Sequence, residues 1–564
     1  MTNDCLHALR TFLADWPVGQ RYAQALSACF LAPAQAITAP PVHPEPSWWR
    51  GHSPYAVAVI VLIVFVSVAQ VPAGYLLAPP GLHFTGAPTY AEDVSVHELY
   101  AAQMAAHLRY QNLMTPEPTP RGWFFHPLDA VMGLAQKATG IPFMALVSAV
   151  ALASAPALAF GLMTMARRAG LDRPGVAAVI ALLAGSFAPL VHGAAMMGLI
   201  HGDIATVRSV GGDATPIFAG HSLYLVLVVF VLAALPMGDA QDPARGFRLA
   251  GILLFVLAAV YPFFIPTLWL TTGFCALLWA RRWGWRPMLK GVGWLGVFSA
   301  LPILYWAVLP WVDSEYARFA AFSGRPLFSP LLTFVSLGLG SGAIIGIPRL
   351  LRANAYQQML ACFAAAFIVA LYVPAHPWRS HIFYLSPMLV IGAIAAWWPM
   401  LLRLRRGLRW ILVGGLLAAA TASIPYYYAR QVSGLAHFEP PTYLTSGDVA
   451  AIQWIAGQPG TDVVLARPDL SLWVASKGHH RVVVGNYYWT HEYGRRRAEV
   501  QAIFEDRADP RALLRAEQVA WVIIDEDRGL PAWARGVKPA ARFDQTVVLR
   551  ADRLLEHLED GHFQ

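Results

Sequence analysis

Apolar residues form long runs along most of this chain, separated by turn signals and short polar stretches. A helix of about 20 apolar residues can cross the roughly 30 Å of hydrocarbon in a bilayer. Runs of about this length or somewhat shorter cover residues 56–77, 142–165, 174–196, 217–236, 248–262, 265–280, 289–309, 330–347, 357–373, 382–400 and 409–427. The pattern predicts an α-helical polytopic membrane protein with about 11 transmembrane helices.

Segment 248–280 allows two interpretations, one long kinked helix or two short spans, because Pro262 and Pro266 lie near its middle. Arginine and lysine accumulate on the cytoplasmic side of membrane proteins. With two spans here and the N-terminus inside, every arginine cluster falls on the cytoplasmic side, so the charge pattern favours two. The clusters are Arg167-Arg168-Arg173, Arg245-Arg248, Arg281-Arg282-Arg286, Arg349-Arg352 and Arg403-Arg405-Arg406-Arg409.

The pattern changes near residue 429. The tail contains 16 Lys/Arg and 18 Asp/Glu, which is 34 of the 74 charged residues in the chain. Short apolar strands alternate with helical stretches there, a pattern typical of a small α/β domain with a partly parallel sheet. We expect a cytoplasmic segment at 1–54, a transmembrane body at 55–428 with a long outer loop at 78–141, and a soluble extracytoplasmic α/β domain at 429–564.

Composition and charge exclude several classes of protein. Only 13% of the residues are charged and 57% are hydrophobic, whereas soluble domains carry about 25% charged residues. The net charge of +8 lies in short clusters between apolar runs, which is typical of membrane topology and argues against nucleic-acid binding. The four cysteines are scattered and imply neither a disulfide framework nor a cysteine-based metal site.

The first outer loop carries an acidic pair, Glu92-Asp93, just before a predicted helix, with His97 and Glu98 one turn later. A helix N-terminus stabilises carboxylates. A carboxylate at the membrane surface could take a proton from an acceptor hydroxyl or bind a divalent metal, so a metal is a further option here. The competing interpretation is that the pair only caps the helix.

Other predicted outer loops contribute positive charge, notably Arg208, Arg379 and His381. Arginine is costly near hydrocarbon unless an anion accompanies it, and a lipid phosphate or pyrophosphate would provide one. Snorkelling of Arg379 beside Trp378 is the alternative. We expect Arg318 to pair with Asp313 or Glu315 instead.

Several segments resemble those of a known family. They are Phe125-His126-Pro127-Leu128, Pro216-Ile217-Phe218-Ala219-Gly220-His221 and Tyr261-Pro262-Phe263, and in the tail 450–455, 481–486, Thr490 and Arg495-Arg496-Arg497. Together with one apolar span and a long outer loop that opens with an acidic pair, they resemble the GT-C superfamily of integral-membrane glycosyltransferases, in particular a bacterial GT-C-like group. Such enzymes use polyprenyl-phosphate-linked sugars.

The resemblance implies that Asp93 or Glu92 is the catalytic base, and that the base deprotonates an acceptor hydroxyl on a glycan, lipid or protein. It also implies basic residues around the donor phosphate, for which Arg379 and His381 fit best and Arg208 comes next. Further candidates for substrate binding are His97, Glu98, His126, His221 and Tyr261.

We therefore expect a glycosyltransferase on the outer face of the bacterial cytoplasmic membrane, with the N-terminus inside and the C-terminal domain outside. That face has no nucleotide sugars, so the donor must arrive on a lipid. The alternative function is a non-catalytic membrane protein that binds or translocates a lipid-linked glycan. A transporter usually carries ionisable residues in mid-span, and these runs carry almost none, which favours the enzyme.

Overall fold

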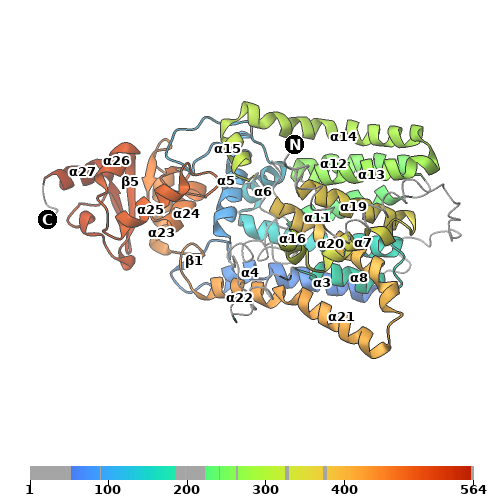
Figure 1. Cartoon of the computed structure of the whole chain (residues 1–564). Coiled ribbons are helices and arrows are strands. Elements are labelled where there is room, and N and C mark those ends of the chain that lie inside the picture. Colours follow the sequence, from blue (N-terminus) through green and yellow to red (C-terminus); the bar gives the residue numbers. More distant parts are fainter. Residues whose placement is uncertain are drawn as a thin grey trace.

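A computed structural model describes residues 53–88, 90–185, 187, 197, 223–239, 242–261, 264–323, 330–371 and 378–560 of the chain. A long body of helices carries a smaller domain with a β-sheet at one end, and this domain contains the C-terminus (Figure 1). The arrangement agrees with the predicted helical body and C-terminal α/β domain.

The described helices of the body coincide with the apolar runs of the sequence. They are α3 (Pro54–Val68), α4 (Gln70–Leu76), α7 (Phe143–Arg168), α8 (Pro174–Leu183), α11 (Leu223–Ala234), α12 (Pro243–Val260), α13 (Ile265–Trp283), α14 (Trp285–Val312), α16 (Pro330–Leu337), α17 (Ser341–Ile345), α18 (Ile347–Leu350), α19 (Ala355–Leu371), α20 (Trp378–Leu401) and α21 (Arg406–Thr421). Short 3-10 turns, η1 (Leu235–Gly238) and η3 (Gly338–Gly340), continue α11 and join α16 to α17.

Within the described ranges, three helical segments are long and apolar enough to cross a membrane, namely Phe143–Arg168, Trp285–Val312 and Thr333–Leu350. The pair α3 and α4, bent by 44°, makes a fourth if it is one span. Several shorter apolar helices accompany them. The count of eleven spans stays a prediction.

Segment 248–280 forms two helices that run in opposite directions. Helices α12 and α14 are parallel, since the Trp306 indole near the end of α14 donates to the Ala258 carbonyl near the end of α12 (2.9 Å). Helix α13 is antiparallel to both. Trp269, near its start, donates to Ser299 in the middle of α14 (3.2 Å), and Trp279, near its end, stacks on Phe247 near the start of α12. Segment 248–280 is therefore two helices and not one long kinked helix, and whether each of them spans the membrane stays a prediction.

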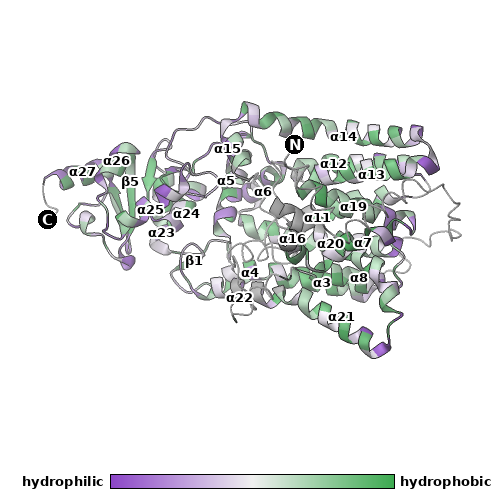
Figure 2. Ribbon diagram, viewed as in Figure 1, coloured by the Kyte–Doolittle hydropathy of each residue, from purple (hydrophilic) through white to green (hydrophobic). Residues whose placement is uncertain are grey.

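The ends of the helices that carry the arginine clusters meet at one end of the body. Arg168 donates to the Leu235 carbonyl (2.8 Å), Gln357 donates to the Ala169 carbonyl (2.6 Å), and Trp279 reaches Gln358 (2.9 Å). Hydrophilic residues gather at this end, opposite the C-terminal domain (Figure 2). The positive-inside rule predicts that this end faces the cytoplasm, and the side of the membrane stays a prediction.

Helix α14 has an exposed tryptophan at each end. Trp285 is 54% exposed and Trp311 is 88% exposed. Their separation of 26 residue steps corresponds to about 39 Å at 1.5 Å per residue. Tryptophan prefers the two interfacial regions of a bilayer, which are about 40–45 Å apart including headgroups. A membrane-spanning α14 would therefore have its Trp311 end at the bilayer surface nearest the C-terminal domain.

The first outer loop contains two helices, α5 (Ala91–His107) and α6 (Pro127–Thr139), which pack against each other. His126 caps α6, because its Nδ1 accepts the Asp129 N–H (3.3 Å), and Pro127 occupies the first turn, where no N–H is needed. At Gly133 the two helices come so close that a Cβ atom would overlap the carbonyl oxygen of Ala101.

The C-terminal domain follows α22 (Ser423–Ala436) and has a five-stranded sheet in the order β4-β3-β5-β7-β6. Strand β3 pairs in parallel with β4 and β5, and the other pairs are antiparallel, so the predicted partly parallel sheet is present. Its strands are β3 (Val463–Leu465), β4 (Arg481–Val482), β5 (Val519–Asp525), β6 (Ala541–Phe543) and β7 (Thr546–Arg550). Its helices are α23 (Ser446–Ala456), α24 (Pro468–Gly478), α25 (Tyr493–Phe504), α26 (Arg511–Ala516) and α27 (Ala551–Glu559).

The domain docks on the first outer loop. Strand β1 (Leu82–Phe84) pairs antiparallel with β2 (Tyr443–Thr445), which lies just before the domain's first helix. The segment after β4 packs on the extended part of the loop, where the Thr490 hydroxyl donates to the Met114 carbonyl (2.6 Å). One apolar core joins α5, this loop and the inner side of the domain. The two halves therefore form one packed unit at the outer end of the body.

The close approach of α5 and α6 predicts the effect of a small substitution. We expect Gly133→Ala to lower the stability of the protein by about 1–3 kcal/mol, because the added methyl group must push the helices apart. Gly293→Ala is the matched control, since a Cβ at that position in α14 meets nothing within 4 Å. Thermal unfolding in detergent measures both, and equal melting temperatures for the two variants would contradict the prediction.

Candidate active site

A cavity of about 720 Å³ lies between the first outer loop, α15 (Ser314–Ser323) and the C-terminal domain. Because α15 begins two residues after α14 ends, the cavity is close to the Trp311 end of α14. Its lining residues are Glu92, Glu315 and Arg318 from the body, and Tyr487, Tyr488, Trp489, Thr490, His491, Glu492, Tyr493, Gly494, Arg495 and Arg497 from the domain.

Glu92 lies in the first turn of α5, where a chain of hydrogen bonds from the C-terminal domain holds its carboxylate. The Tyr493 hydroxyl donates to Glu92 Oε1 (3.2 Å), and Arg497 Nη1 donates to the Tyr493 oxygen (2.6 Å). Burial raises the pKa of Glu92, and the Tyr493 hydrogen bond and the Arg497 charge offset this only in part. A carboxylate with a raised pKa is a stronger base, which suits proton abstraction near neutral pH.

Glu92 is not the residue that caps α5. The N-cap residue of α5 is Tyr90, in a left-handed conformation with φ of 56°, and no side chain caps the helix there. Asp93 follows Glu92 and is half-buried. Successive helical residues point about 100° apart, so the two carboxylates face different directions. Only Glu92 of the pair lines this cavity.

His97 and His126 hold a carboxylate that the sequence analysis did not single out. The Nδ1 atom of each imidazole lies close to Asp129 Oδ2, at 2.9 Å for His97 and 3.0 Å for His126. Burial alone would raise the pKa of Asp129, but the two imidazoles outweigh it and hold this pKa well below its usual range. Asp129 comes two residues after Pro127, in the first turn of α6. An acidic residue at the start of a helix was the sequence feature that could have identified it. Neither histidine lines the cavity.

The other candidates from the sequence lie elsewhere. Glu98 Oε1 binds Lys477 (2.6 Å) and thereby links α5 to α24, so Glu98 faces the domain contact and not the cavity. Tyr261 ends α12 and packs on Phe264, with ring centroids 5.0 Å apart. Arg208 and His221 lie outside the described residues, and of Arg379 and His381 only the backbone, in α20, is described.

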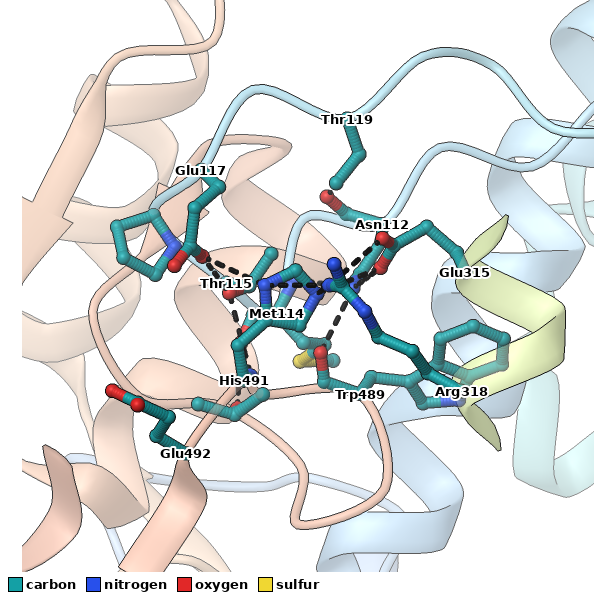
Figure 3. Close-up of polar contacts among 12 residues, drawn as sticks. Asn112, Met114, Thr115, Glu117, Thr119, Glu315, Arg318, Trp489, His491 and Glu492 are labelled. Carbon is teal, nitrogen blue, oxygen red and sulfur yellow. Dashed lines mark hydrogen bonds and ion pairs between the residues drawn. The ribbon is translucent and has the colours of Figure 1, made fainter. Parts of the chain in front are cut away.

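A second polar network borders the cavity and joins the body to the domain (Figure 3). His491 lies between two carboxylates, with Nε2 3.1 Å from Glu315 and Nδ1 3.2 Å from Glu117. Arg318 pairs with Glu315 (3.3 Å), as the sequence predicts, and also contacts His491. Burial would raise the pKa of Glu315, but hydrogen bonds from His491 and from Asn112 hold it below its usual range.

His491 and Glu117 were missed in the sequence because no local pattern relates them. Arg496 continues the network to Glu117 (2.5 Å), and it is buried between Glu117 and Glu517 (3.2 Å). The Arg495-Arg496-Arg497 cluster is therefore not a uniformly solvated helix face. Arg495 is exposed and pairs with Glu492 (2.6 Å), whereas Arg496 is internal.

The aromatic residues after β4 divide into two groups. Trp489 is buried and stacks on Phe319 of α15, with centroids 5.1 Å apart and planes 7° apart, so it packs the domain on the body. Tyr487, Tyr488 and Tyr493 are only partly buried and line the cavity. Asn486 lies beneath them and donates to the backbone carbonyl of Glu92 (3.1 Å).

A metal site remains unassigned. In the part of the chain that the structure describes, no group of three or more His, Cys, Asp or Glu residues is arranged to hold a metal ion. The cavity is lined by carboxylates, arginines and tyrosines together with His491.

The low pKa of Asp129 predicts a pH dependence of stability. A carboxylate whose folded pKa lies below its unfolded value of about 3.9 stabilises the fold above that value and loses this contribution as the pH falls. We expect thermal stability to fall below about pH 4. Asp129→Asn should lower stability by about 1–3 kcal/mol at pH 7 and flatten the acid limb. Asp544→Asn, an exposed position, is the control, and an acid limb that is equally steep in both variants would contradict this role.

No family model and no curated protein sequence matches the chain. Solved structures are similar to it at low identity. The archaeal oligosaccharyltransferase AglB from Archaeoglobus fulgidus, in complex with an inhibitory peptide and a dolichol-phosphate, has 13% identity and a TM-score of 0.44. That similarity covers 84% of this chain and 70% of AglB.

Two further structures give similar values. ArnT from Cupriavidus metallidurans, bound to undecaprenyl phosphate, has 17% identity and a TM-score of 0.42, over 88% of this chain and 97% of ArnT. The arabinofuranosyltransferase AftD from Mycobacteria has 15% identity and a TM-score of 0.46, over 90% of this chain and 38% of AftD. All these TM-scores are below 0.5, so the function of this chain has to be derived from its own residues.

Proposed function

We propose that this chain is a membrane glycosyltransferase that transfers a sugar from a polyprenyl-phosphate donor to an acceptor on the outer face of the bacterial cytoplasmic membrane, with Glu92 as the catalytic base. The observation that carries the proposal is the Glu92 carboxylate on the wall of the cavity, with a pKa raised by burial and a position fixed by Tyr493 and Arg497.

In the proposed reaction the base, the acceptor and the departing phosphate each have one role. Glu92 takes the proton from an acceptor hydroxyl as the oxygen attacks the anomeric carbon of the donor sugar. A bond forms between the acceptor oxygen and this carbon, and the bond from the carbon to the phosphate oxygen breaks. The bonding electrons leave with the polyprenyl phosphate, which departs as a phosphate monoester anion. Cations near the departing oxygen stabilise its charge.

Among the described residues, Arg318 is the arginine that lines the cavity from the body side, and its side chain is 58% exposed. Its guanidinium already contacts Glu315 and His491, which fixes its position. Arg379, His381 and Arg208 remain candidates for binding the donor phosphate, as the family resemblance implies. Arginine can bind two phosphate oxygens at once, which makes it the usual ligand for this group.

The location of the cavity favours a donor carried by a lipid. Exposed Trp311 lies in the last turn of α14, three residues before α15 begins, and exposed Trp123, stacked under Arg109 (4.7 Å), lies in the first outer loop. Exposed tryptophans are typical of the bilayer interface. A polyprenyl phosphate has its phosphate at this level while its chain stays in hydrocarbon, so the donor would reach the cavity without leaving the membrane.

Substitution of the two neighbouring carboxylates tests the assignment. We expect Glu92→Gln to lower donor consumption by about 10²–10⁴-fold, because the general base is lost while the shape of the side chain is kept. Asp93→Asn should lower it much less. The assay follows radiolabelled polyprenyl-phosphate sugars in proteoliposomes, with donor binding measured in parallel. Glu556→Gln, exposed on α27, is the control.

The outcomes separate the hypotheses. Loss of turnover in Asp93→Asn with activity retained in Glu92→Gln would move the base to Asp93. In another outcome, the wild-type protein binds the donor without consuming it although a full set of acceptors is supplied. That result would contradict the glycosyltransferase proposal and favour the alternative, a non-catalytic protein that binds or translocates a lipid-linked glycan.

A further inference from the structure

The cavity also indicates what the acceptor is. We infer that the acceptor is a saccharide with little net charge, and that it binds between the tyrosines of the C-terminal domain and Glu92. The inference rests on the proposed function, because it identifies the second substrate of the same site. It assigns to the C-terminal domain the selection of the acceptor.

The tyrosines form a concave aromatic wall. The ring centroids of Tyr487 and Tyr488 are 4.0 Å apart with planes at 36°, and Tyr487 and Tyr493 are 6.2 Å apart with planes at 63°. Rings inclined to each other in this way cannot form one flat stack, and their partly exposed faces line the cavity. The C–H face of a sugar ring is apolar and packs on such faces, while the phenol groups and edges offer hydrogen bonds.

The charges of the cavity balance. Its arginines are Arg318, Arg495 and Arg497, and its carboxylates are Glu92, Glu315 and Glu492, which gives three of each sign. A site for a polyanion would have an excess of cations, and a site for a lipid tail would have few charges at all. Carboxylates accept hydrogen bonds and guanidinium groups donate them. A cavity that contains both is suited to adjacent sugar hydroxyl groups, because a hydroxyl group both donates and accepts hydrogen bonds.

The wall is held rigidly before any ligand binds. Thr490 accepts the Gly485 N–H (2.9 Å) while its hydroxyl binds the body, and the Asn486 side chain accepts the Tyr488 N–H (2.8 Å). A Cβ atom at Gly485 would overlap Met114, so the segment lies tightly against the body at its start. A preorganised wall lowers the entropy cost of binding a flexible, hydroxyl-rich ligand.

The geometry connects this wall to the chemistry. Tyr493 is both part of the aromatic wall and the hydrogen-bond donor to Glu92 (3.2 Å). A saccharide packed on the tyrosines would therefore have its hydroxyl groups next to the proposed base. The volume of about 720 Å³ is within the range of small-molecule sites and has room for more than one ring.

Glycan binding, measured without turnover, tests the inference. The full-length protein in nanodiscs is applied to an array of neutral and charged oligosaccharides, and affinity for the best ligand is then measured in solution. We expect neutral glycans to bind and Tyr487→Ala to weaken this binding at least tenfold. Tyr428→Ala, an exposed tyrosine of α22 outside the cavity, is the matched control and should keep the wild-type affinity. Equal melting temperatures establish that both variants are folded.

A competition experiment identifies which substrate the cavity holds. A non-transferable phosphonate analogue of the donor is added to the protein–glycan complex. Retention of the glycan supports an acceptor site, because both substrates must be bound together for transfer. Displacement by the analogue, but not by polyprenyl phosphate, would assign the cavity to the donor sugar and overturn the inference.

Three further results would also overturn the inference: no binding to any glycan, exclusive binding of acidic glycans, and unchanged affinity in Tyr487→Ala. Because glycan binding needs no catalysis, it can fail while Glu92→Gln still abolishes donor consumption, and it can succeed when donor consumption is absent. The two proposals are thus tested separately.

Discussion

The attachment of the C-terminal domain to the first outer loop depends on the burial of one aromatic side chain, Trp489. Its ring packs on Phe319 of α15 and lies 5.0 Å from Tyr110 and 5.9 Å from Tyr100 in the loop, so it joins its own segment to two others that are far away in the sequence. Truncation of a fully buried tryptophan costs about 3–5 kcal/mol. The proposed base comes from the loop and its hydrogen-bonding partners come from the domain, so the site exists only while this contact holds.

Charged groups at the same contact contribute specificity more than stability. Lys477 binds buried Glu98, and His491 lies between two carboxylates, all at the surface where domain and body meet. Desolvation offsets much of the attraction in such pairs, but any other docking arrangement would leave several of these charges buried without a partner. The apolar core brings the two halves together, and the ion pairs define one relative orientation. A cavity formed between them then has a constant shape.

The sequence predicts the parts of this molecule that depend on local properties. The apolar runs lie on helices, the tail has its partly parallel sheet, and Glu92 could be singled out because it begins a helix after the first run. The partners of Glu92 could not be predicted, because Tyr493 and Arg497 lie about 400 residues later and meet it only through domain docking. For the same reason, the sequence could name His97 and His126 as candidates but could not show that both contact Asp129.

The pairing of β1 with β2 has a consequence for biosynthesis. Leu82–Phe84 leaves the ribosome early, whereas Tyr443–Thr445 follows only after α21, the last apolar helix of the described body. Until then the edge of β1 and the apolar side of α5 have no domain to cover them, and unpaired strand edges and exposed apolar surfaces promote aggregation. The first outer loop therefore stays without its β2 partner and its covering domain while most of the chain is synthesised. The candidate site can be completed only after the C-terminal domain has been synthesised, so a chain that ends before that domain would leave the loop uncovered and the proposed base without Tyr493 and Arg497.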